Sequence, residues 1–162
     1  MEGGRVAALN LVARLDGVGK VVEITGTPGS SPAIDRSKGF NDVIDEFPQM
    51  EIIARQTGEF RRSEGRNVME DIITSNPDFD AVFAANDGML MGAQSAIEAS
   101  HIDENDVLLQ GFDAIPDALE AVERGDVTGT IEQHPAGQIK RAYSMMMSYV
   151  RDEERPEKAV QF

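Results

Sequence analysis

The sequence predicts an α/β fold in which a doubly wound parallel sheet carries helices on both faces. Five short runs rich in apolar and β-branched residues alternate with segments whose apolar residues recur at helical spacing. Runs such as AVFAA (81–85) and VLLQGF (107–112) are apolar with little alternation, as expected for strands buried on both faces. The composition, 41% hydrophobic and 27% charged over 162 residues, is that of one globular domain.

The chain is predicted to start with a helix, a strand and a second helix. An apolar pattern indicates a helix near residues 5–15, which ends at the turn residues of DGVGK. The strand KVVEIT (20–25) follows, and then the glycine-rich turn GTPGSSP (26–32). Proline suits the first helical position and serine the N-cap, so Ser31 is predicted to cap a helix from Pro32 to about residue 46.

The same alternation continues to the end of the chain. The predicted elements are a strand at 50–56, a helix at 63–75, a strand at 80–85, a helix at 88–100, a strand at 106–112, a helix at 116–124, a strand at 127–133 and a helix at 136–151. Parallel neighbours need a crossover, and a helix is the usual one, so this order indicates a parallel sheet. The charged run RDEERPEK (151–158) indicates an exposed tail.

The composition also limits the partners. The net charge of −14 would repel nucleic acids and anionic membranes over most of the surface, so we expect no nucleic-acid partner. No apolar run approaches the roughly 20 residues that cross a bilayer. The first fifteen residues have an acidic second residue and apolar positions at helical spacing (Val6, Leu9, Val12 and Ala13), which is not the pattern of a signal peptide.

Polar and aromatic side chains stand where the predicted strands end. Ligands of open α/β sheets collect outside the carboxyl ends of the strands, so these positions are candidates for a binding site. In chain order they are Ser30, Ser31, Arg36, Phe60, Asn86, Asp87, Asp113, Gln133 and His134. Charged and amide groups make several directional hydrogen bonds, and an aromatic ring covers C–H faces, so this set suits a hydroxyl-rich ligand such as a sugar.

The residues alone leave a structural alternative open for most of these positions. Asp87 is predicted to cap the helix that follows it. Asn86 fits a loop amide bonded to the backbone as well as a ligand contact. Arg36 also fits a solvated helix position, and Phe60 a core position.

Motifs for catalysis and for cofactors are missing. The turn at 26–32 lacks the GK[ST] ending of a phosphate-binding loop and the spacing of a dinucleotide fingerprint, and neither G-x-S-x-G nor H-E-x-x-H occurs. The sequence has no cysteine, and His101 and His134 are too far apart to indicate a metal cluster. We therefore expect no enzyme, cofactor or metal. A hydrolase or transferase that uses Asp87 or Asp113 as acid or base is the less favoured alternative.

At these positions the sequence resembles the carboxyl-terminal lobe of the periplasmic monosaccharide-binding proteins of ABC importers, such as ribose-binding and galactofuranose-binding proteins. The resemblance covers nearly the whole chain and is carried by four motifs in the same order, GTPGSSPAIDRSKGF, GEFRRSEGRNVMEDII, VFAANDGMLMGAQSAIEA and GFDAIPDALEAVERGDVTGTIEQHP. It implies a lobe of the type 1 periplasmic binding protein fold, in which two similar lobes close on a sugar.

The resemblance also implies which residues touch that sugar. Arg36 matches the arginine that bonds ring and hydroxyl oxygens, and Phe60 the aromatic residue that packs on the sugar. Asn86 matches the asparagine of the ND pair, Asp113 the aspartate of GFD, and Gln133 a glutamine near a hinge crossing. On this reading Asn86 faces the ligand, and Asp87 is the capping, hinge-facing member of the pair.

The implied function is the substrate-binding component of a sugar ABC importer. Its ligand would be a monosaccharide or polyol, its partner the ABC permease, and its location the periplasm or cell exterior for the parent protein. The regulators related to lactose repressor share the fold and the ND…GFD pattern, so a sugar-sensing domain is the alternative. The segment after GFD is more similar to the transport proteins.

The last predicted helix stands apart from the rest. We expect residues 1–135 to form the sugar-binding lobe, and residues 136–162 to form a helix and tail that the family packs on its other lobe. The helix carries an apolar stripe at helical spacing, made of Ile139, Ala142, Tyr143, Met146, Met147 and Val150. An apolar face without a core favours a homo-oligomer, or packing onto the lobe itself, over an ordinary packing stripe.

Overall fold

The chain divides into two compact units, Met1–Glu132 and Gln133–Phe162. The structure, a computed structural model, describes residues 1–76, 78–103 and 106–152. Within these ranges no helix is long and apolar enough to cross a membrane. Most of the tail predicted at 151–158 lies outside the described residues.

The centre of the first unit is a parallel sheet of five strands. They are β1 (Val18–Thr25), β2 (Gln49–Thr57), β3 (Ala81–Ala84), β4 (Leu108–Phe112) and β5 (Gly129–Ile131). Their order in the sheet is β2-β1-β3-β4-β5, and each neighbouring pair runs parallel. The chain moves outward from β1 to β2 and then crosses back to β3, so the strand order reverses between β1 and β3. Such a switch point is where open sheets bind their ligands.

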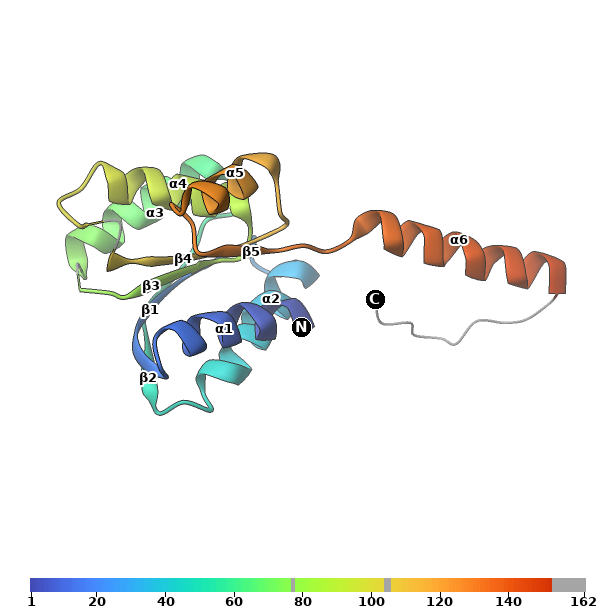
Figure 1. The fold of residues 1–162 in the computed structure, drawn as a ribbon, viewed down its shortest axis with the longest axis horizontal. Helices are drawn as coiled ribbons and strands as arrows, with labels where there is room; N and C mark the ends of the chain where they lie inside the picture. The colour runs from blue at the N-terminus through green and yellow to red at the C-terminus, as the bar shows by residue number, and fades with distance from the viewer. Residues whose placement is uncertain (77, 104–105, 153–162) are drawn as a thin grey trace. The chain divides into compact units, whose positions relative to one another are not determined.

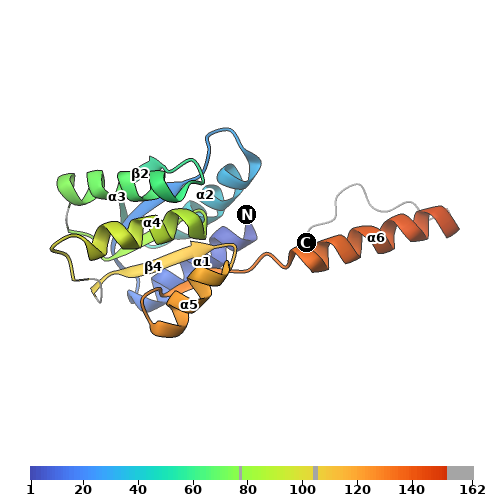
Figure 2. The same ribbon diagram turned by 90° about the horizontal axis from the view of Figure 1, so that it is seen from above.

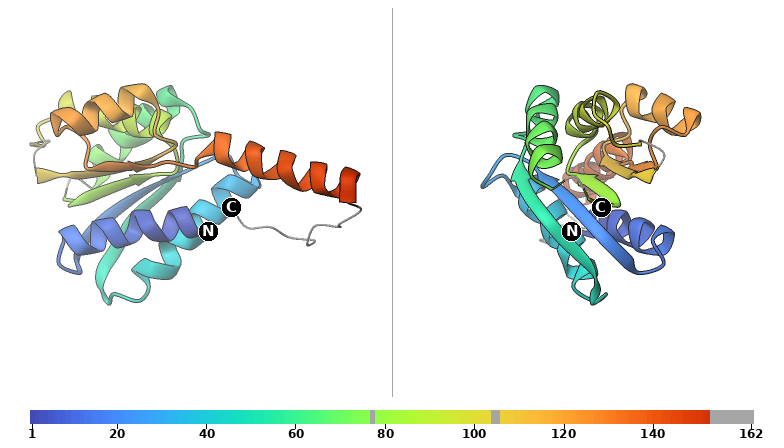
Figure 3. Two further views of the ribbon diagram at one scale, coloured as in Figure 1. Left: turned by 45° about the vertical axis from the view of Figure 1, so that its right-hand side comes forward. Right: turned by 90° about the vertical axis from the view of Figure 1, so that its left-hand side faces the viewer.

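Helices cover both faces of this sheet (Figure 1). The helices of the first unit are α1 (Glu2–Arg14), α2 (Ser31–Ile44), α3 (Arg62–Ser75), α4 (Asp87–Glu98) and α5 (Pro116–Arg124). From above, α3, α4 and α5 lie in that order across one face (Figure 2), and α1 and α2 cover the other in both views of Figure 3. The predicted doubly wound α/β fold is confirmed.

Alternation along the strands divides the core between the two faces. In β1, Val22 and Ile24 pack toward α3 and α4, whereas Val21 packs toward α1 and α2. On the α1–α2 side, Phe40 of α2 stacks on Phe83 of β3 with ring centroids 4.1 Å apart. Both rings are fully buried, so their stacking anchors α2 on β3.

Glycines allow the helices on each face to approach closely. A Cβ atom on Gly4 of α1 would lie 2.2 Å from the carbonyl oxygen of Arg36 on α2. On the other face, a Cβ atom on Gly92 of α4 would lie 2.1 Å from the carbonyl oxygen of Arg62 on α3. No real Cβ atom approaches a backbone oxygen so closely, so each helix pair depends on glycine at its crossing.

All the predicted helices and strands are present, with shifted ends. The first helix begins at Glu2. The predicted N-cap of α2 is wrong by one residue, because Ser30 is the extended residue before the helix and Ser31 is already helical. Ser30 donates its hydroxyl to the carbonyl oxygen of Thr27 at 2.8 Å, and it makes no side-chain cap bond to the helix.

The second unit contains α6 (Pro135–Asp152). Four apolar side chains spaced along it, Ile139, Tyr143, Met146 and Val150, are between 52% and 70% exposed. The intervals of four, three and four residues between them place them on one face of the helix.

Candidate functional site

The carboxyl ends of the strands position four of the five predicted ligand residues. Phe60 follows β2, Asn86 follows β3, Asp113 follows β4, and Arg36 lies on α2 after β1. Contacts between the side chains join them into one cluster, because Arg36 lies against Phe60 and Asp113, and Asn86 reaches the backbone of Phe60. The structure therefore brings these four residues together, and their role in binding a ligand stays a prediction.

Arg36 is the centre of the cluster and is only 9% exposed. Its Nη1 donates to the carbonyl oxygen of Ala85 at 2.5 Å, and its Nη2 lies 3.0 Å from Oδ1 of Asp113. The guanidinium carbon sits 4.0 Å from the ring centroid of Phe112 and 5.8 Å from that of Phe60. Aromatic faces attract a guanidinium, so two rings and two oxygens hold its plane in place.

Phe112 is a member of this cluster that the sequence reasoning missed. It is the last residue of β4, directly before Asp113, and it is 6% exposed. A Cβ atom on Gly3 of α1 would lie 2.4 Å from its ring, so the glycine provides the space for this ring. Phe112 is the aromatic residue of GFD, at the end of a predicted strand and directly before Asp113. That position was the signal in the sequence that could have placed it in the cluster.

Phe60 is held by an unusual backbone turn. Both Glu59 and Phe60 have left-handed backbone angles, with φ of 55° and 57°. The ring of Phe60 lies against Gly26 at the end of β1, where a Cβ atom would be 2.0 Å from the ring. Asn86 Nδ2 donates to the carbonyl oxygen of Phe60 at 3.5 Å. The turn presents the ring, half-buried, beside Arg36.

Asn86, and not Asp87, caps the helix that follows β3. Asn86 Oδ1 accepts a hydrogen bond from the backbone N–H of Met89 at 2.9 Å, in the geometry of an N-cap. The prediction that Asp87 caps α4 is therefore wrong. Asp87 is already helical, fully buried, and bonded to residues outside its own helix. Both are good cap residues, and contacts from distant segments decide between them.

Asp87 lies between α4, β5 and the start of α5. Thr130 donates its hydroxyl to the carboxylate at 2.7 Å, and the backbone N–H of Ile115 donates to Oδ2 at 3.0 Å. Burial raises the pKa of Asp87 above its ordinary value, and the nearby Asp113 charge adds to this, while the two hydrogen bonds oppose it. No pattern in the sequence indicates this contact, because its partners lie 28 and 43 residues away.

Gln133 begins the second compact unit, so it is not among the residues that the first unit brings together. Its carbonyl oxygen accepts from Nε2 of Gln138 at 2.8 Å, and its place in a ligand site stays a prediction. His134, with a left-handed φ of 49°, belongs to the same unit. Across the described ranges, no three His, Asp or Glu side chains gather as a metal ion would require.

The cluster offers a buried cation, a carboxylate, an amide and an aromatic face at the switch point of the sheet. These groups make directed hydrogen bonds to hydroxyl oxygens and pack against C–H surfaces. That chemistry would suit a polyhydroxylated molecule.

Comparison with known proteins identifies the family of this chain. A family model described as a periplasmic binding protein domain matches residues 1–154. The D-apiose import binding protein of Paraburkholderia graminis is 35% identical over 150 residues, which are 93% of this chain and 47% of that protein. The ribose import binding protein of Bacillus subtilis is 36% identical over 135 residues, 83% of this chain and 43% of that protein.

A solved structure shows the same fold. The binding protein of the arabinose ABC transporter from Shewanella sp. ANA-3, bound to α- and β-L-arabinofuranose, superposes with a TM-score of 0.92 at 33% identity. The match covers 99% of this chain and 54% of that one, and the chain spans about half the length of the relatives it matches. On the family match and this fold, the chain belongs to the periplasmic binding protein domain family.

Proposed function

We propose that this chain is one lobe of the substrate-binding component of a sugar ABC importer, and that it binds a monosaccharide or polyol without transforming it. The observation that carries the proposal is the cluster of Arg36, Phe60, Asn86 and Asp113 at the carboxyl ends of β1 to β4. The names of its relatives support it, since they are binding proteins for the import of apiose and ribose and the binding component of an arabinose ABC transporter.

Each residue has a distinct part in this proposal. Arg36 and Asp113 supply charge-assisted hydrogen bonds to ring and hydroxyl oxygens, which are about twice as strong as neutral ones. Asn86 and Gln133 supply amide hydrogen bonds, and Phe60 packs on the C–H face of the ring. Arg36 and Asp113 are paired 3.0 Å apart, so a sugar hydroxyl would meet charges that are already placed.

The parent protein would carry a second lobe that covers the other side of the sugar. Closure of the two lobes would bury the ligand and present the loaded form to the membrane permease. The parent would work in the periplasm or outside the cell. This chain alone should bind its sugar far more weakly than the parent, because much of the ligand surface would stay in water.

Calorimetry with a panel of pentoses, hexoses and polyols that includes D-apiose, D-ribose, L-arabinose, D-allose and myo-inositol tests the proposal. The parent protein should release heat with one of these sugars, and Arg36→Ala should weaken that binding at least about tenfold. Arg66→Ala is the matched control, because Arg66 pairs with Glu70 on the exposed side of α3. Absence of heat with any tested pentose, hexose or polyol would contradict the proposal. Chemical conversion of the sugar would favour the hydrolase or transferase alternative.

We also propose a role for residues 136–162. In the parent they would pack against the second lobe, and in this chain alone α6 would associate with a second copy. Ile139, Tyr143, Met146 and Val150 have the spacing of a coiled-coil seam, and all four are exposed. Sedimentation should show a dimer that Tyr143→Glu disrupts and that Ser144→Glu, on another face, leaves intact. A monomer at all concentrations would contradict the association.

A further inference from the structure

The turn that follows β4 has a strained backbone. Asp113 and Ala114 have φ of 109° and 52°, in the region that favours glycine. Such conformations cost of order 1 kcal/mol or more for residues with a side chain, and they persist only where surrounding contacts hold them. Because Asp113 is also the partner of Arg36, the conformation of this turn sets where its carboxylate lies.

Three successive backbone N–H groups of the turn each donate a hydrogen bond to a different acceptor. The N–H of Asp113 donates to the carbonyl oxygen of Ile131 at 2.8 Å. The N–H of Ala114 donates to Oγ1 of Thr130 at 3.1 Å, and the N–H of Ile115 to Oδ2 of Asp87 at 3.0 Å. Two of these three acceptors are side-chain atoms, so they can be removed without breaking the sheet.

Asp87 and Thr130 accept two of these hydrogen bonds and are also bonded to each other. The Thr130 hydroxyl accepts from Ala114 and donates to Asp87, which lies 2.7 Å away at Oδ1. The contact needs a glycine at position 111, because a Cβ atom there would lie 2.1 Å from Oδ1 of Asp87. The Asp87 carboxylate on α4 therefore packs against Gly111 of β4 and is hydrogen-bonded to Thr130 of β5.

The fold of α4 does not explain why a carboxylate is buried there. The helix already has its N-cap in Asn86, whose side chain satisfies the N–H of Met89. A buried carboxylate is costly, and burial raises the pKa of Asp87 accordingly. Its hydrogen bonds lead to β5 and to the turn that carries Asp113.

We propose that Asp87 and Thr130 are positioning residues, which hold the Asp113 turn in its left-handed conformation and so keep the Asp113 carboxylate against Arg36. They touch no sugar in this arrangement and act through the turn. The consequence for sugar affinity rests on the proposed function, whereas the ordering of the turn does not.

Amide hydrogen exchange on this chain tests the ordering of the turn without any sugar. Thr130→Val is nearly isosteric and removes both the donor and the acceptor. The amides of Ala114 and Ile115 should then exchange at least about tenfold faster, because the local opening becomes easier. Thr130→Ser keeps the hydroxyl and should restore slow exchange. Unchanged exchange in Thr130→Val would overturn the proposal.

Thr128→Val is the matched control for a general loss of stability. Thr128 precedes β5, and its hydroxyl accepts from the backbone N–H of Leu109 at 2.8 Å, away from the turn. This variant should leave the amides of Ala114 and Ile115 protected. Equal loss of protection in Thr128→Val and Thr130→Val would overturn the proposal. The carboxyl carbon signal of Asp87 gives a second readout, since loss of the Thr130 bond should raise the pKa of Asp87 further.

Calorimetry with D-ribose, or whichever tested sugar the parent binds, supplies the functional arm. Thr130→Val should bind about tenfold more weakly than wild type, and Thr130→Ser should bind nearly as well. A parent that binds none of the sugars refutes the proposed function, while the exchange results still decide the role of Asp87 and Thr130. Faster exchange with unchanged sugar affinity would show that Asp87 and Thr130 order the turn but do not position a ligand group. That result would overturn the proposal.

Discussion

At the scale of single residues, the core contains a buried carboxyl group that is not part of the ligand cluster. Glu23 lies on β1 and has no exposed surface. Its Oε2 accepts from Nε of Arg55 at 2.6 Å and from Nδ2 of Asn41 at 3.0 Å. No hydrogen-bond donor to its Oε1 is found among the described residues. Arg55 on β2 is the group that compensates this buried charge.

Removal of Arg55 should therefore be costly. Arg55→Ala leaves the Glu23 carboxylate buried without its cation, and we expect a loss of about 2 kcal/mol in the free energy of unfolding, since Arg55 is half-exposed. Arg66→Ala breaks an exposed pair with Glu70 and should cost no more than about 0.5 kcal/mol. Urea denaturation of both variants measures the difference. Equal losses would show that the burial of Glu23 has no energetic consequence.

The raised pKa of Asp87 predicts how stability depends on pH. Because its pKa is higher in the folded state than its ordinary 3.8, the native protein holds this proton more tightly than the unfolded chain does. Stability from this group is therefore greatest at low pH, and it falls as pH rises from about 3.8 through the folded-state pKa. Asp87→Asn cannot ionise and should lack this dependence.

Urea denaturation of wild type and Asp87→Asn across that pH range isolates the effect, since the other carboxylates titrate in both proteins. As pH rises, the unfolding free energy of the wild type should fall relative to that of Asp87→Asn, because only the wild type ionises at this position. Above the folded-state pKa the difference between the two proteins should be constant. A difference that is flat at all pH values would show that burial does not raise the pKa of Asp87.

Strand-end positions placed Arg36, Phe60, Asn86 and Asp113 among the candidates, and the structure brings them together, because parallel strands have their carboxyl ends at one edge of the sheet. They were not enough to assign Asn86 and Asp87. Either residue makes a good N-cap, and the choice depends on distant contacts with Asp87, which local patterns do not encode.

At the scale of elements, the sequence predicted where helices lie better than which face they bury. On α1 the large residues Val6 and Leu9 are exposed, while Ala7 and Ala8 are fully buried. The reason is the close crossing of α1 and α2, where a Cβ atom on Gly4 would already meet backbone. Small residues fill such an interface, and a search for large apolar residues misses it.

The α3–α4 crossing makes the same argument testable. A Cβ atom on Gly92 would lie 2.1 Å from the carbonyl oxygen of Arg62 and 2.8 Å from the N of Arg66, both backbone atoms that cannot move aside alone. We expect Gly92→Ala to force the helices apart and cost about 2 kcal/mol of stability.

Gly88 lies on the same helix and serves as the matched control. A Cβ atom there has no neighbour nearer than 3.6 Å, so Gly88→Ala should be neutral or stabilise by up to about 1 kcal/mol through helix propensity. Thermal unfolding of the two variants gives the comparison. If both alanines have the same effect, close helix contact at Gly92 is not what the fold requires.

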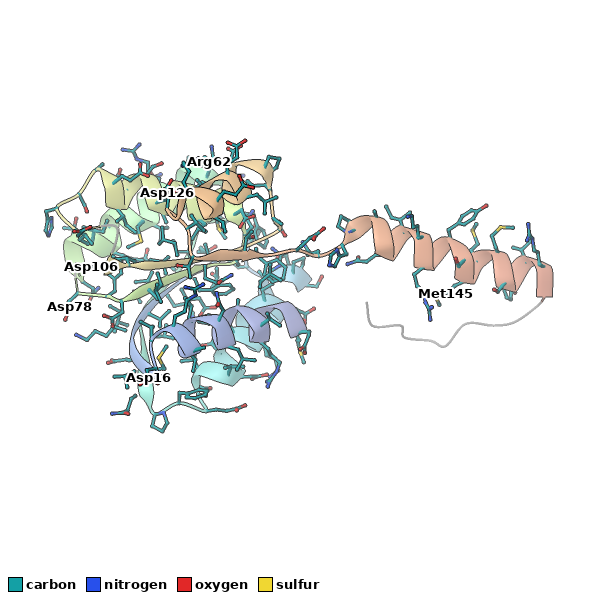
Figure 4. The ribbon with its side chains drawn as sticks, viewed as in Figure 1. Asp16, Arg62, Asp78, Asp106, Asp126 and Met145 are labelled. Atoms are coloured by element: carbon teal, nitrogen blue, oxygen red, sulfur yellow. The ribbon has the colours of Figure 1, made fainter. Side chains whose placement is uncertain are left out.

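At the scale of the whole molecule, the dominant feature is negative charge. The chain has 29 acidic and 15 basic residues. Part of the acid is concentrated, since Asp16, Asp78 and Asp106 lie at one end of the first unit, where β1, β3 and β4 begin (Figure 4). Lys20 lies there too, and its bond to Asp78 raises the pKa of Lys20. The candidate ligand cluster lies at the opposite ends of these strands, where its one buried cation is matched by Asp113.

Repulsion among these charges should make stability depend on salt. At pH 7 the net charge of −14 opposes compaction, and added salt screens it, since the Debye length falls from about 30 Å at 0.01 M to about 3 Å at 1 M. We expect the Tm to rise as sodium chloride is added over this range. The surface ion pairs lose strength under the same conditions, but exposed pairs contribute little each.

The same titration at pH 4.4, the pI of about 4.4, is the control, because little net charge is left to screen. A Tm that is flat or falls with salt at pH 7 would mean that the acidic surface does not destabilise the fold, and an equal rise at both pH values would assign the effect to salting-out of apolar surface instead.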